Sequence, residues 1–276
     1  MSRKPLTIML DSGAFSAWNK GVSIDLDAYI QFIKDSAEWI DFYVNLDVIP
    51  GEFGRIPSLV EVEESAQKSW DNFLYMQEFS LNPIPVYHMG EDSKWLKRML
   101  DHGCEYIGIS PANDRSTKEK IFWLDRVFEM LVDSKRAPIV KTHAFGVTNV
   151  SIMRRYPWYS VDSSAWSKTA GLGSVFIPKF DKHGTPKFTH SPTTVVFSTK
   201  QKTHAKNSFH VFPEKIQTQI RKYVESKGEN LESLFTDYAP RCRMNVHFFE
   251  GVVDQIHKDG LDKIFHKKRS MFFEEV

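Results

Sequence analysis

The feature that most constrains the fold is an alternation of short apolar runs with longer amphipathic stretches, from residue 6 to residue 164. The apolar runs have the composition of buried strands, and the stretches between them carry apolar residues at helical spacing. Such an alternation with short connections predicts a parallel sheet with right-handed crossovers. We therefore expect the α/β class, and within it a (β/α)8 TIM-like barrel that is irregular in its C-terminal third.

The expected elements follow one another in a regular order up to residue 164. We expect strands over 6–10, 39–46, 84–90, 106–110, 138–146 and 158–164. We expect helices over 25–38, 58–79, 93–102 and 116–133, and a short helix that begins at Thr148 or Asn149. Beyond residue 170 we expect short strands within 174–198, a turn at His183-Gly184, and helices over 213–226 and 242–257. Residues 1–276 then form one barrel domain, in which 174–227 is a basic, partly β insertion.

Polar residues cluster at the C-terminal ends of the expected strands. They are Asp11-Ser12, Asp47, His88, Ser110, His143 and Asp162-Ser163. In an α/β barrel the carboxyl ends of the strands converge on one mouth, where the chemistry takes place. Each residue also has a purely structural interpretation, because Asp11 can belong to an Asx turn and Asp162 can cap a helix. Their common position predicts one site at the mouth of the sheet.

Charge is distributed unevenly along the chain, although the total is only +1. Residues 1–133 hold 13 Lys and Arg against 22 Asp and Glu, and residues 134–276 hold 23 against 13. In the stretch 179–227 cations are interleaved with Phe180, Phe188, Phe197, Phe209 and Phe212. A solvated lysine-rich surface has this composition, and so does a surface that binds phosphates and stacks bases. The candidate nucleic-acid contacts are Lys168, Lys179, Lys182, Lys187, Lys200, Lys202 and Lys206.

Several classes of protein are excluded by what the sequence lacks. The two cysteines, Cys104 and Cys242, cannot form a disulfide framework or a four-thiolate zinc site. No apolar run reaches the ~18 residues that span a bilayer, and Asp11 comes too early for a signal peptide, so we expect a cytoplasmic protein without membrane contact. Cys242 and His247 do not complete a metal site, and GLGS (171–174) lacks the third glycine of a dinucleotide fingerprint. We expect no metal and no cofactor.

In their order along the chain, the motifs resemble those of the tRNA-guanine transglycosylase superfamily. DSGAFS (11–16) resembles its Asp-Ser-Gly-Gly-Phe motif, and LDVIP (46–50) matches the place of its base-recognising aspartate. PVYHMGE (85–91) resembles the strand with Gln-Gly-Gly, YIGISP (106–111) the Gly-Gly-Leu segment, and THAFGVT (142–148) the Gly-Val-Gly turn. YSVDSSAW (159–166) occupies the place of the nucleophilic aspartate. The resemblance covers roughly residues 6–175.

Two departures from the family point to one of its branches. The zinc-binding cysteine cluster is absent, and the chain is short for a tRNA enzyme. Both features resemble the phage-type DNA 7-deazaguanine transglycosylases, which exchange guanine in DNA for a 7-deazaguanine base such as 7-cyano-7-deazaguanine. The resemblance implies two partners, namely DNA that is single-stranded or has a flipped base, and the free 7-deazaguanine base. It implies a location in the host cytoplasm and leaves the oligomeric state open.

The resemblance also implies a role for each candidate residue. Asp162 would attack the anomeric carbon of the sugar, and Asp11 would protonate the departing base and deprotonate the incoming one. Asp47 would accept hydrogen bonds from the N–H edge of the purine, with His88 in place of the family's Gln. The other pocket residues would be Ser12, Gly13, Phe15, Gly108 and His143, with Phe15, Tyr87 or Phe145 stacked on the base.

Three alternatives remain open at this point. The same chemistry could act on tRNA instead of DNA. An unrelated TIM-barrel lyase or aldolase could form a Schiff base at Lys141, which lies within the expected strand 138–146. A barrel that binds nucleic acid without catalysis is the third, although pure phosphate binding has no use for acidic residues at one mouth.

Overall fold

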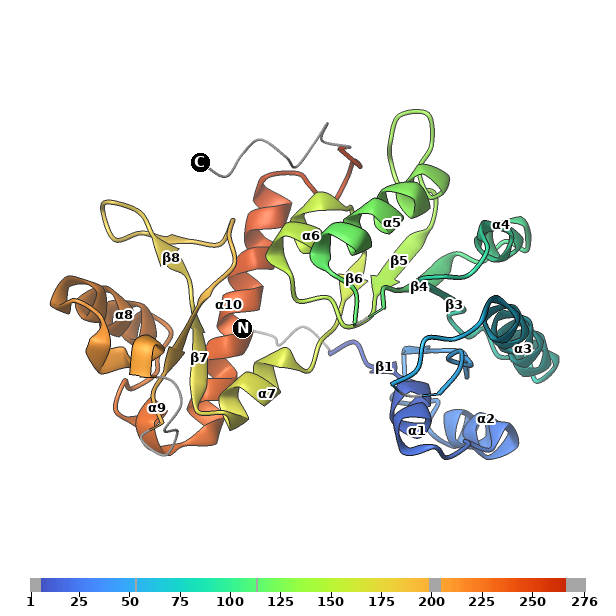
Figure 1. Ribbon diagram of the computed structural model, residues 1–276, viewed down its shortest axis with the longest axis horizontal. Helices are drawn as coiled ribbons and strands as arrows, with labels where there is room; N and C mark the ends of the chain where they lie inside the picture. The colour runs from blue at the N-terminus through green and yellow to red at the C-terminus, as the bar shows by residue number, and fades with distance from the viewer. Residues whose placement is uncertain (1–5, 53, 113, 199–204, 267–276) are drawn as a thin grey trace. The chain divides into compact units, whose positions relative to one another are not determined.

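The computed structural model describes residues 6–52, 54–112, 114–198 and 205–266, and the chain divides into two compact units (Figure 1). The first unit comprises Met1–Val132 and Ile139–Phe145, and the second comprises Asp133–Pro138 and Gly146–Val276. Each unit has its own core.

The first unit contains parallel strands that are neighbours in chain order. Strand β1 (Met9–Leu10) pairs in parallel with β2 (Phe42–Tyr43), and Val44 forms a parallel bridge to Ile84 just before the next strand. Strands β3 (Val86–His88), β4 (Tyr106–Ser110) and β5 (Lys141–Ala144) then pair in parallel with one another. The predicted α/β class with a parallel sheet is therefore confirmed.

Helices fill the connections between these strands. They are α1 (Ala14–Lys20), α2 (Leu26–Asp35), α3 (Leu59–Glu78), α4 (Ser93–Asp101) and α5 (Thr117–Met130). Helices α3 and α5 each begin with a capping box, formed by Ser58 with Glu61 and by Ser116 with Glu119. In a capping box the serine hydroxyl and the glutamate satisfy backbone N–H groups that have no partner inside the helix. Four of the five helices were predicted within a few residues, and α1 was not predicted.

The core of the first unit lies on both faces of its strands. Ile107, Gly108 and Ile109 of β4 are all buried, which is typical of a parallel strand covered by helices on both sides. On one side Ile30 and Ile33 of α2 pack in a cluster with residues of β1, β2 and α3. The buried strands leave only their ends accessible, so polar side chains at the ends are the natural place for a site.

In the described part of the second unit there are ten further α-helices and strands, six of which have four residues or fewer. They are α6 (Val150–Arg155), β6 (Ser160–Val161), α7 (Ala165–Gly171), β7 (Ser174–Ile177), β8 (Lys179–Phe180), β9 (Pro186–Lys187), β10 (Thr193–Val196), α8 (Glu214–Ser226), α9 (Ser233–Thr236) and α10 (Tyr238–Lys258). Two 3-10 turns, η1 (Ala205–Asn207) and η2 (Phe209–Val211), precede α8. Strand β7 pairs with β10, and β8 pairs with β9 across the predicted turn at His183-Gly184, both in antiparallel fashion.

Helix α10 lies alongside β7 and α7 in the second unit (Figure 1). The fully buried Asn245 accepts a hydrogen bond from the backbone N–H of Phe176 and donates to the carbonyl of Trp166, at 2.6 and 2.8 Å. Arg241 donates to the carbonyls of Ala170 and Leu234, both at 2.9 Å. Through these hydrogen bonds to backbone carbonyls, both side chains connect α10 to α7, and Arg241 also connects it to α9.

The phenylalanines of the basic stretch belong to this core. Phe197 and Phe209 are buried, and Phe180, Phe188 and Phe212 pack against the same cluster. Phe197 and Phe209 are therefore not accessible for stacking on bases, whereas a nucleic-acid surface in this stretch stays a prediction.

Two predictions about the whole chain stay predictions. They are the closed eight-stranded barrel and the single domain over residues 1–276. After α7 the strands described in the second unit are antiparallel, in agreement with an irregular C-terminal third. Within the described ranges, no helix has the length and apolarity that crossing a bilayer requires.

Candidate functional site

The carboxylate of Asp47 is the point where three predicted motifs of the first unit meet. Asp47 follows β2, and its side chain is only 9% exposed. Its Oδ1 accepts a hydrogen bond from the Ser12 hydroxyl at 3.1 Å, and its Oδ2 lies 2.9 Å from Nε2 of His88. Ser12 follows β1 and His88 ends β3. Because parallel strands carry their carboxyl ends to the same edge, residues far apart in sequence converge on one carboxylate.

His88 is held between two carboxylates. Its Nδ1 lies 2.9 Å from Oε1 of Glu91, on the side opposite to Asp47, and Oε2 of Glu91 accepts the backbone N–H of His88 at 3.2 Å. The Glu91 side chain is 2% exposed. Burial by itself lowers the pKa of His88, but the charge of Glu91 and the hydrogen bond to Asp47 outweigh it and raise the pKa from 6.5 to about 10. The imidazole is therefore charged at neutral pH.

Asp11 acts in the same neighbourhood as Asp47. Both carboxylates raise the pKa of the Tyr29 hydroxyl, after the larger effect of burial, and that hydroxyl donates to the carbonyl of Val44 at 2.8 Å. Asp11 itself is exposed, whereas Ser12 beside it is buried. Asp11, the predicted acid/base residue, thus has access to solvent, whereas the carboxylate of Asp47 is largely buried.

The turn after β1 depends on Gly13. Gly13 has φ of 76°, a left-handed conformation that glycine adopts readily, and it is the residue at which α1 begins. The Ser12 hydroxyl accepts the N–H of Ala14 at 3.2 Å, which orients its proton towards Asp47. In α1, Phe15 is 48% exposed and Trp18 donates to the carbonyl of Gly51 at 2.7 Å. Helix α1 therefore ties the first motif to the loop that carries Asp47.

Gly108 and His143 lie inside their strands, before the carboxyl ends at Ser110 and Ala144. Gly108 of β4 is in register with Val86 of β3 and with His143 of β5. A Cβ atom at Gly108 would come within 2.5 Å of the Phe145 ring, so the missing side chain makes room for that ring. His143 is buried, and its ring lies edge to face on Phe145 at 4.5 Å. Phe145 thus covers Gly108 from the neighbouring strand.

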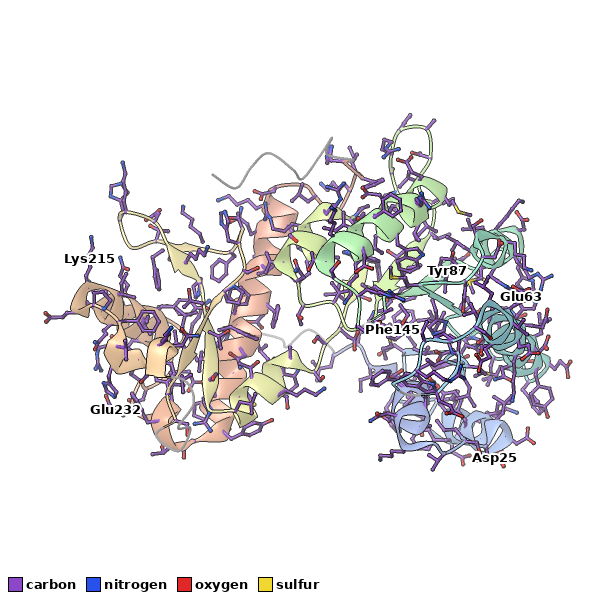
Figure 2. All side chains as sticks on the ribbon, in the orientation of Figure 1. Asp25, Glu63, Tyr87, Phe145, Lys215 and Glu232 are labelled. Atoms are coloured by element: carbon purple, nitrogen blue, oxygen red, sulfur yellow. The ribbon has the colours of Figure 1, made fainter. Side chains whose placement is uncertain are left out.

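Of the three aromatic residues considered for stacking, the structure separates Tyr87 from the other two. Tyr87, labelled with Phe145 in Figure 2, is buried and stacks on Trp123 of α5 at 5.7 Å. Its hydroxyl donates to the carbonyl of Glu91 at 3.0 Å. Tyr87 therefore packs towards a helix and does not offer its face to a base, so that part of the prediction was wrong. Phe15 and Phe145 retain partly exposed rings.

Asp162, the predicted nucleophile, belongs to the second unit. Its exposed carboxylate accepts the backbone N–H of Gly146 at 2.8 Å. The alternative interpretation as a helix cap is not supported, since the N-cap residue of α7 is Ser164, which makes no side-chain cap, and Ser163 accepts the N–H of Ala165. The carboxylate of Asp162 is thus held by the backbone of Gly146, within the THAFGVT motif.

Lys141 lies at the opposite end of its strand from the site residues. It is the first residue of β5 and is in register with Tyr106, the first residue of β4. His88 and Ser110, by contrast, are in register at the carboxyl ends of β3 and β4. Because the two ends of a strand face opposite edges of the sheet, Lys141 does not share the edge of Asp47.

The candidate nucleic-acid contacts of the second unit are exposed where they are described. They are Lys168, Lys179, Lys182, Lys187 and Lys206, whereas Lys200 and Lys202 lie outside the described residues. Lys187 forms an ion pair with Asp181 at 3.1 Å across the β8–β9 hairpin. Asp181 also accepts the backbone N–H groups of His183 and Thr185 in the turn. Part of the positive charge of Lys187 is therefore already neutralised.

Sequence reasoning missed Glu91. It stands three residues after His88 and directly after Gly90, and the segment HMGE was noted only for its histidine. A histidine followed by a carboxylate at this spacing beyond a strand end is a signal that could have found it. In the part of the chain that the structure describes, no cluster of three or more His, Cys, Asp or Glu side chains is arranged to hold a metal ion.

No family model matches the chain, and no curated protein matches its sequence. The functional interpretation therefore rests on the geometry around Asp47 and on the order of the sequence motifs.

Proposed function

We propose that the protein is a base-exchanging transglycosylase that replaces guanine in DNA by a 7-deazaguanine base. The observation that carries this proposal is the convergence of Ser12 and His88 on the carboxylate of Asp47. These three residues come from the ends of three different strands. The resemblance to the tRNA-guanine transglycosylase superfamily assigned the same three residues to one base pocket.

A fixed and buried carboxylate suits the N–H edge of guanine. Each carboxylate oxygen has two acceptor positions, and Ser12 and His88 occupy one on each oxygen of Asp47. The remaining positions can accept the N1–H and the exocyclic amine of a guanine-type base side by side. Such charge-assisted hydrogen bonds are about twice as strong as neutral ones, and 7-deazaguanines carry the same edge.

The exchange itself needs a nucleophile and one acid/base group. In the first step a carboxylate oxygen of Asp162 forms a bond to the anomeric carbon as the carbon–nitrogen bond to guanine breaks, and protonated Asp11 gives its proton to the departing base. In the second step ionised Asp11 takes the proton from the incoming base, whose nitrogen displaces Asp162. Two displacements at one carbon retain its configuration, as in retaining glycosidases. No oxidant, reductant or phosphoryl donor is consumed.

DNA must present the target nucleotide outside the helix stack. A base that is flipped, or that lies in single-stranded DNA, can enter a pocket at a strand edge, at a cost of a few kcal/mol for unstacking. The exposed lysines of the second unit, Lys179 and Lys182 among them, are suited to the phosphates.

The test is incorporation of a labelled base. Protein incubated with duplex DNA and labelled guanine or 7-cyano-7-deazaguanine, without ATP, is expected to label the DNA, and mass spectrometry of the nucleosides identifies the product. Labelling of tRNA alone would assign the same chemistry to RNA. If folded protein labels neither polymer with any of these bases, the proposal is wrong.

Substitution of the nucleophile separates catalysis from binding. Asp162→Asn is expected to abolish labelling while DNA binding stays within about twofold of wild type, because the exposed carboxylate does not bind phosphate. Asp254→Asn, at an exposed position on α10 in the same unit, is the matched control and keeps full activity. An Asp162→Asn variant that retains exchange would remove Asp162 from the mechanism. Borohydride trapping of a carbonyl substrate on Lys141 would instead support the Schiff-base alternative.

A further inference from the structure

We infer that His88 is a fixed imidazolium which, backed by the buried carboxylate of Glu91, positions Asp47 for the bound base. The role in base binding rests on the proposed function, whereas the charge of His88 does not. His88 is a positioning residue, since it contacts Asp47 and Glu91 and acts on the base only through Asp47.

The number of protons follows from the geometry. Both ring nitrogens of His88 lie 2.9 Å from a carboxylate oxygen, one from Asp47 and one from Glu91. A neutral imidazole carries one N–H, so its other nitrogen would turn a lone pair towards the oxygen of a carboxylate. Two hydrogen bonds of this length therefore require a second proton in the row of three groups.

The partners of the two carboxylates place that proton on the imidazole. Asp47 also accepts the Ser12 hydroxyl, and Glu91 also accepts the backbone N–H of His88. Each of these hydrogen bonds stabilises an ionised carboxylate. The charged groups that act on His88 are Asp47 on one side and Glu91 on the other, so the row holds one positive and two negative charges.

Glu91 owes its place to a short loop that turns back on β3. Its carbonyl accepts the Tyr87 hydroxyl at 3.0 Å, and its backbone N–H donates to the carbonyl of His88 at 3.2 Å. The backbone of Glu91 is thus fixed by two consecutive residues of β3, Tyr87 and His88. A carboxylate buried to this degree needs a charged partner, and His88 supplies it.

The consequence for the site is a recognition carboxylate that cannot rotate. With Oδ1 bound by Ser12 and Oδ2 bound by His88, the plane of the Asp47 carboxylate is set before a ligand arrives. A base then binds without the cost of ordering this side chain. Loss of the charge on His88 would free Asp47 to rotate and would leave Glu91 buried without a cation.

The charge of His88 is measured by nuclear magnetic resonance on protein with ¹⁵N-labelled histidine. We expect both ring nitrogens of His88 to remain protonated from pH 6 to pH 9, with or without any base. Glu91→Gln is expected to move deprotonation into this range, because the largest favourable charge is removed while the hydrogen bond can be kept. A His88 signal with one protonated nitrogen at pH 7 would overturn the inference.

The positioning role is measured by the affinity for free guanine in isothermal titration calorimetry. His88→Gln keeps a donor for Asp47 without the charge and is expected to weaken binding about tenfold or more, the worth of one charged hydrogen bond. His247→Gln is the matched control, since His247 and Glu250 form an exposed pair with the same spacing on α10, and it leaves affinity unchanged. Equal affinity of His88→Gln and wild type would refute positioning. Wild-type protein that binds no guanine would refute the proposed function. The charge of His88 would still be decided by the nuclear magnetic resonance experiment.

Discussion

At the scale of single residues, the row Asp47–His88–Glu91 makes stability depend on pH. The pKa of His88 is about 10 in the folded protein against 6.5 for an ordinary histidine, so the folded state binds its proton more tightly than the unfolded chain. The contribution to the free energy of unfolding is complete below pH 6.5 and is lost as pH rises towards 10. We expect a loss on the order of 1 kcal/mol for each pH unit in this window.

Urea unfolding of wild type and His88→Gln at intervals from pH 6 to pH 10 measures this dependence. The difference in free energy of unfolding between the two proteins is expected to shrink steadily with rising pH. Val60→Ala, at an exposed position on α3 in the same unit, changes no titrating group and keeps a constant difference from wild type. A difference between wild type and His88→Gln that is also constant would mean that His88 does not carry the extra proton.

The same row shows which site residues a sequence can reveal. Ser12, Asp47 and His88 were predictable because each follows or ends an apolar run, and parallel strands bring such positions to one edge. Glu91 was not predictable in this way, because its partner depends on a loop that folds back on its own strand. Tyr87 was misassigned because the alternation of a strand sends neighbouring side chains to opposite faces.

At the scale of elements, the packing of β4 against β5 depends on the absence of a side chain at Gly108. Gly108→Ala would place a Cβ 2.5 Å from Cε2 of Phe145 and 3.3 Å from Cγ2 of Val86. We expect overpacking to lower the free energy of unfolding by about 1–3 kcal/mol, measured by urea denaturation. Phe145→Leu removes the ring that the added Cβ would meet. The double variant Gly108→Ala/Phe145→Leu is therefore expected to lose less stability than the sum of the two single variants, since the two residues are in contact.

Gly171→Ala is the control for this substitution. Gly171 ends α7, and the nearest atom to an added Cβ is Cε2 of Tyr238 at 3.9 Å, an ordinary contact. Alanine there is expected to leave stability unchanged or slightly raised. If Gly108→Ala were equally harmless, Phe145 would have to move freely over β4, and the close packing at Gly108 would not hold.

The elements also differ in how well the sequence foretells them. Helix α3 was predicted within one residue at each end and α5 within three, and the serine-to-glutamate spacing of Ser58 and Ser116 is a start signal that a sequence can reveal. The seven-residue helices α1 and α7 were missed, because so few residues give no helical periodicity. Strands β1 and β2 are shorter than their apolar runs, since a strand ends where its partner ends.

At the scale of the whole molecule, the split in charge follows the division into two units. The first unit holds 14 Lys and Arg against 21 Asp and Glu, and the second holds 22 against 14. The sequence revealed this asymmetry but not the division itself, because the second unit also takes in Asp133–Pro138 from between α5 and β5. An acidic unit repels phosphates and a basic unit attracts them, so we expect DNA to bind chiefly through the second unit.

The salt dependence of DNA binding tests this expectation. The logarithm of the association constant is expected to fall linearly with the logarithm of salt concentration, with a slope near 0.9 for each phosphate neutralised on duplex DNA. Lys179→Gln and Lys182→Gln, at exposed positions on and beside the β8–β9 hairpin, are each expected to reduce the slope by up to about 0.9. Lys97→Gln in the first unit, where Lys97 pairs with Asp101 at 2.8 Å, is the control and leaves the slope unchanged. A slope that responds to Lys97 and not to Lys179 or Lys182 would place the phosphates on the first unit, because only cations that release counterions from DNA contribute to it.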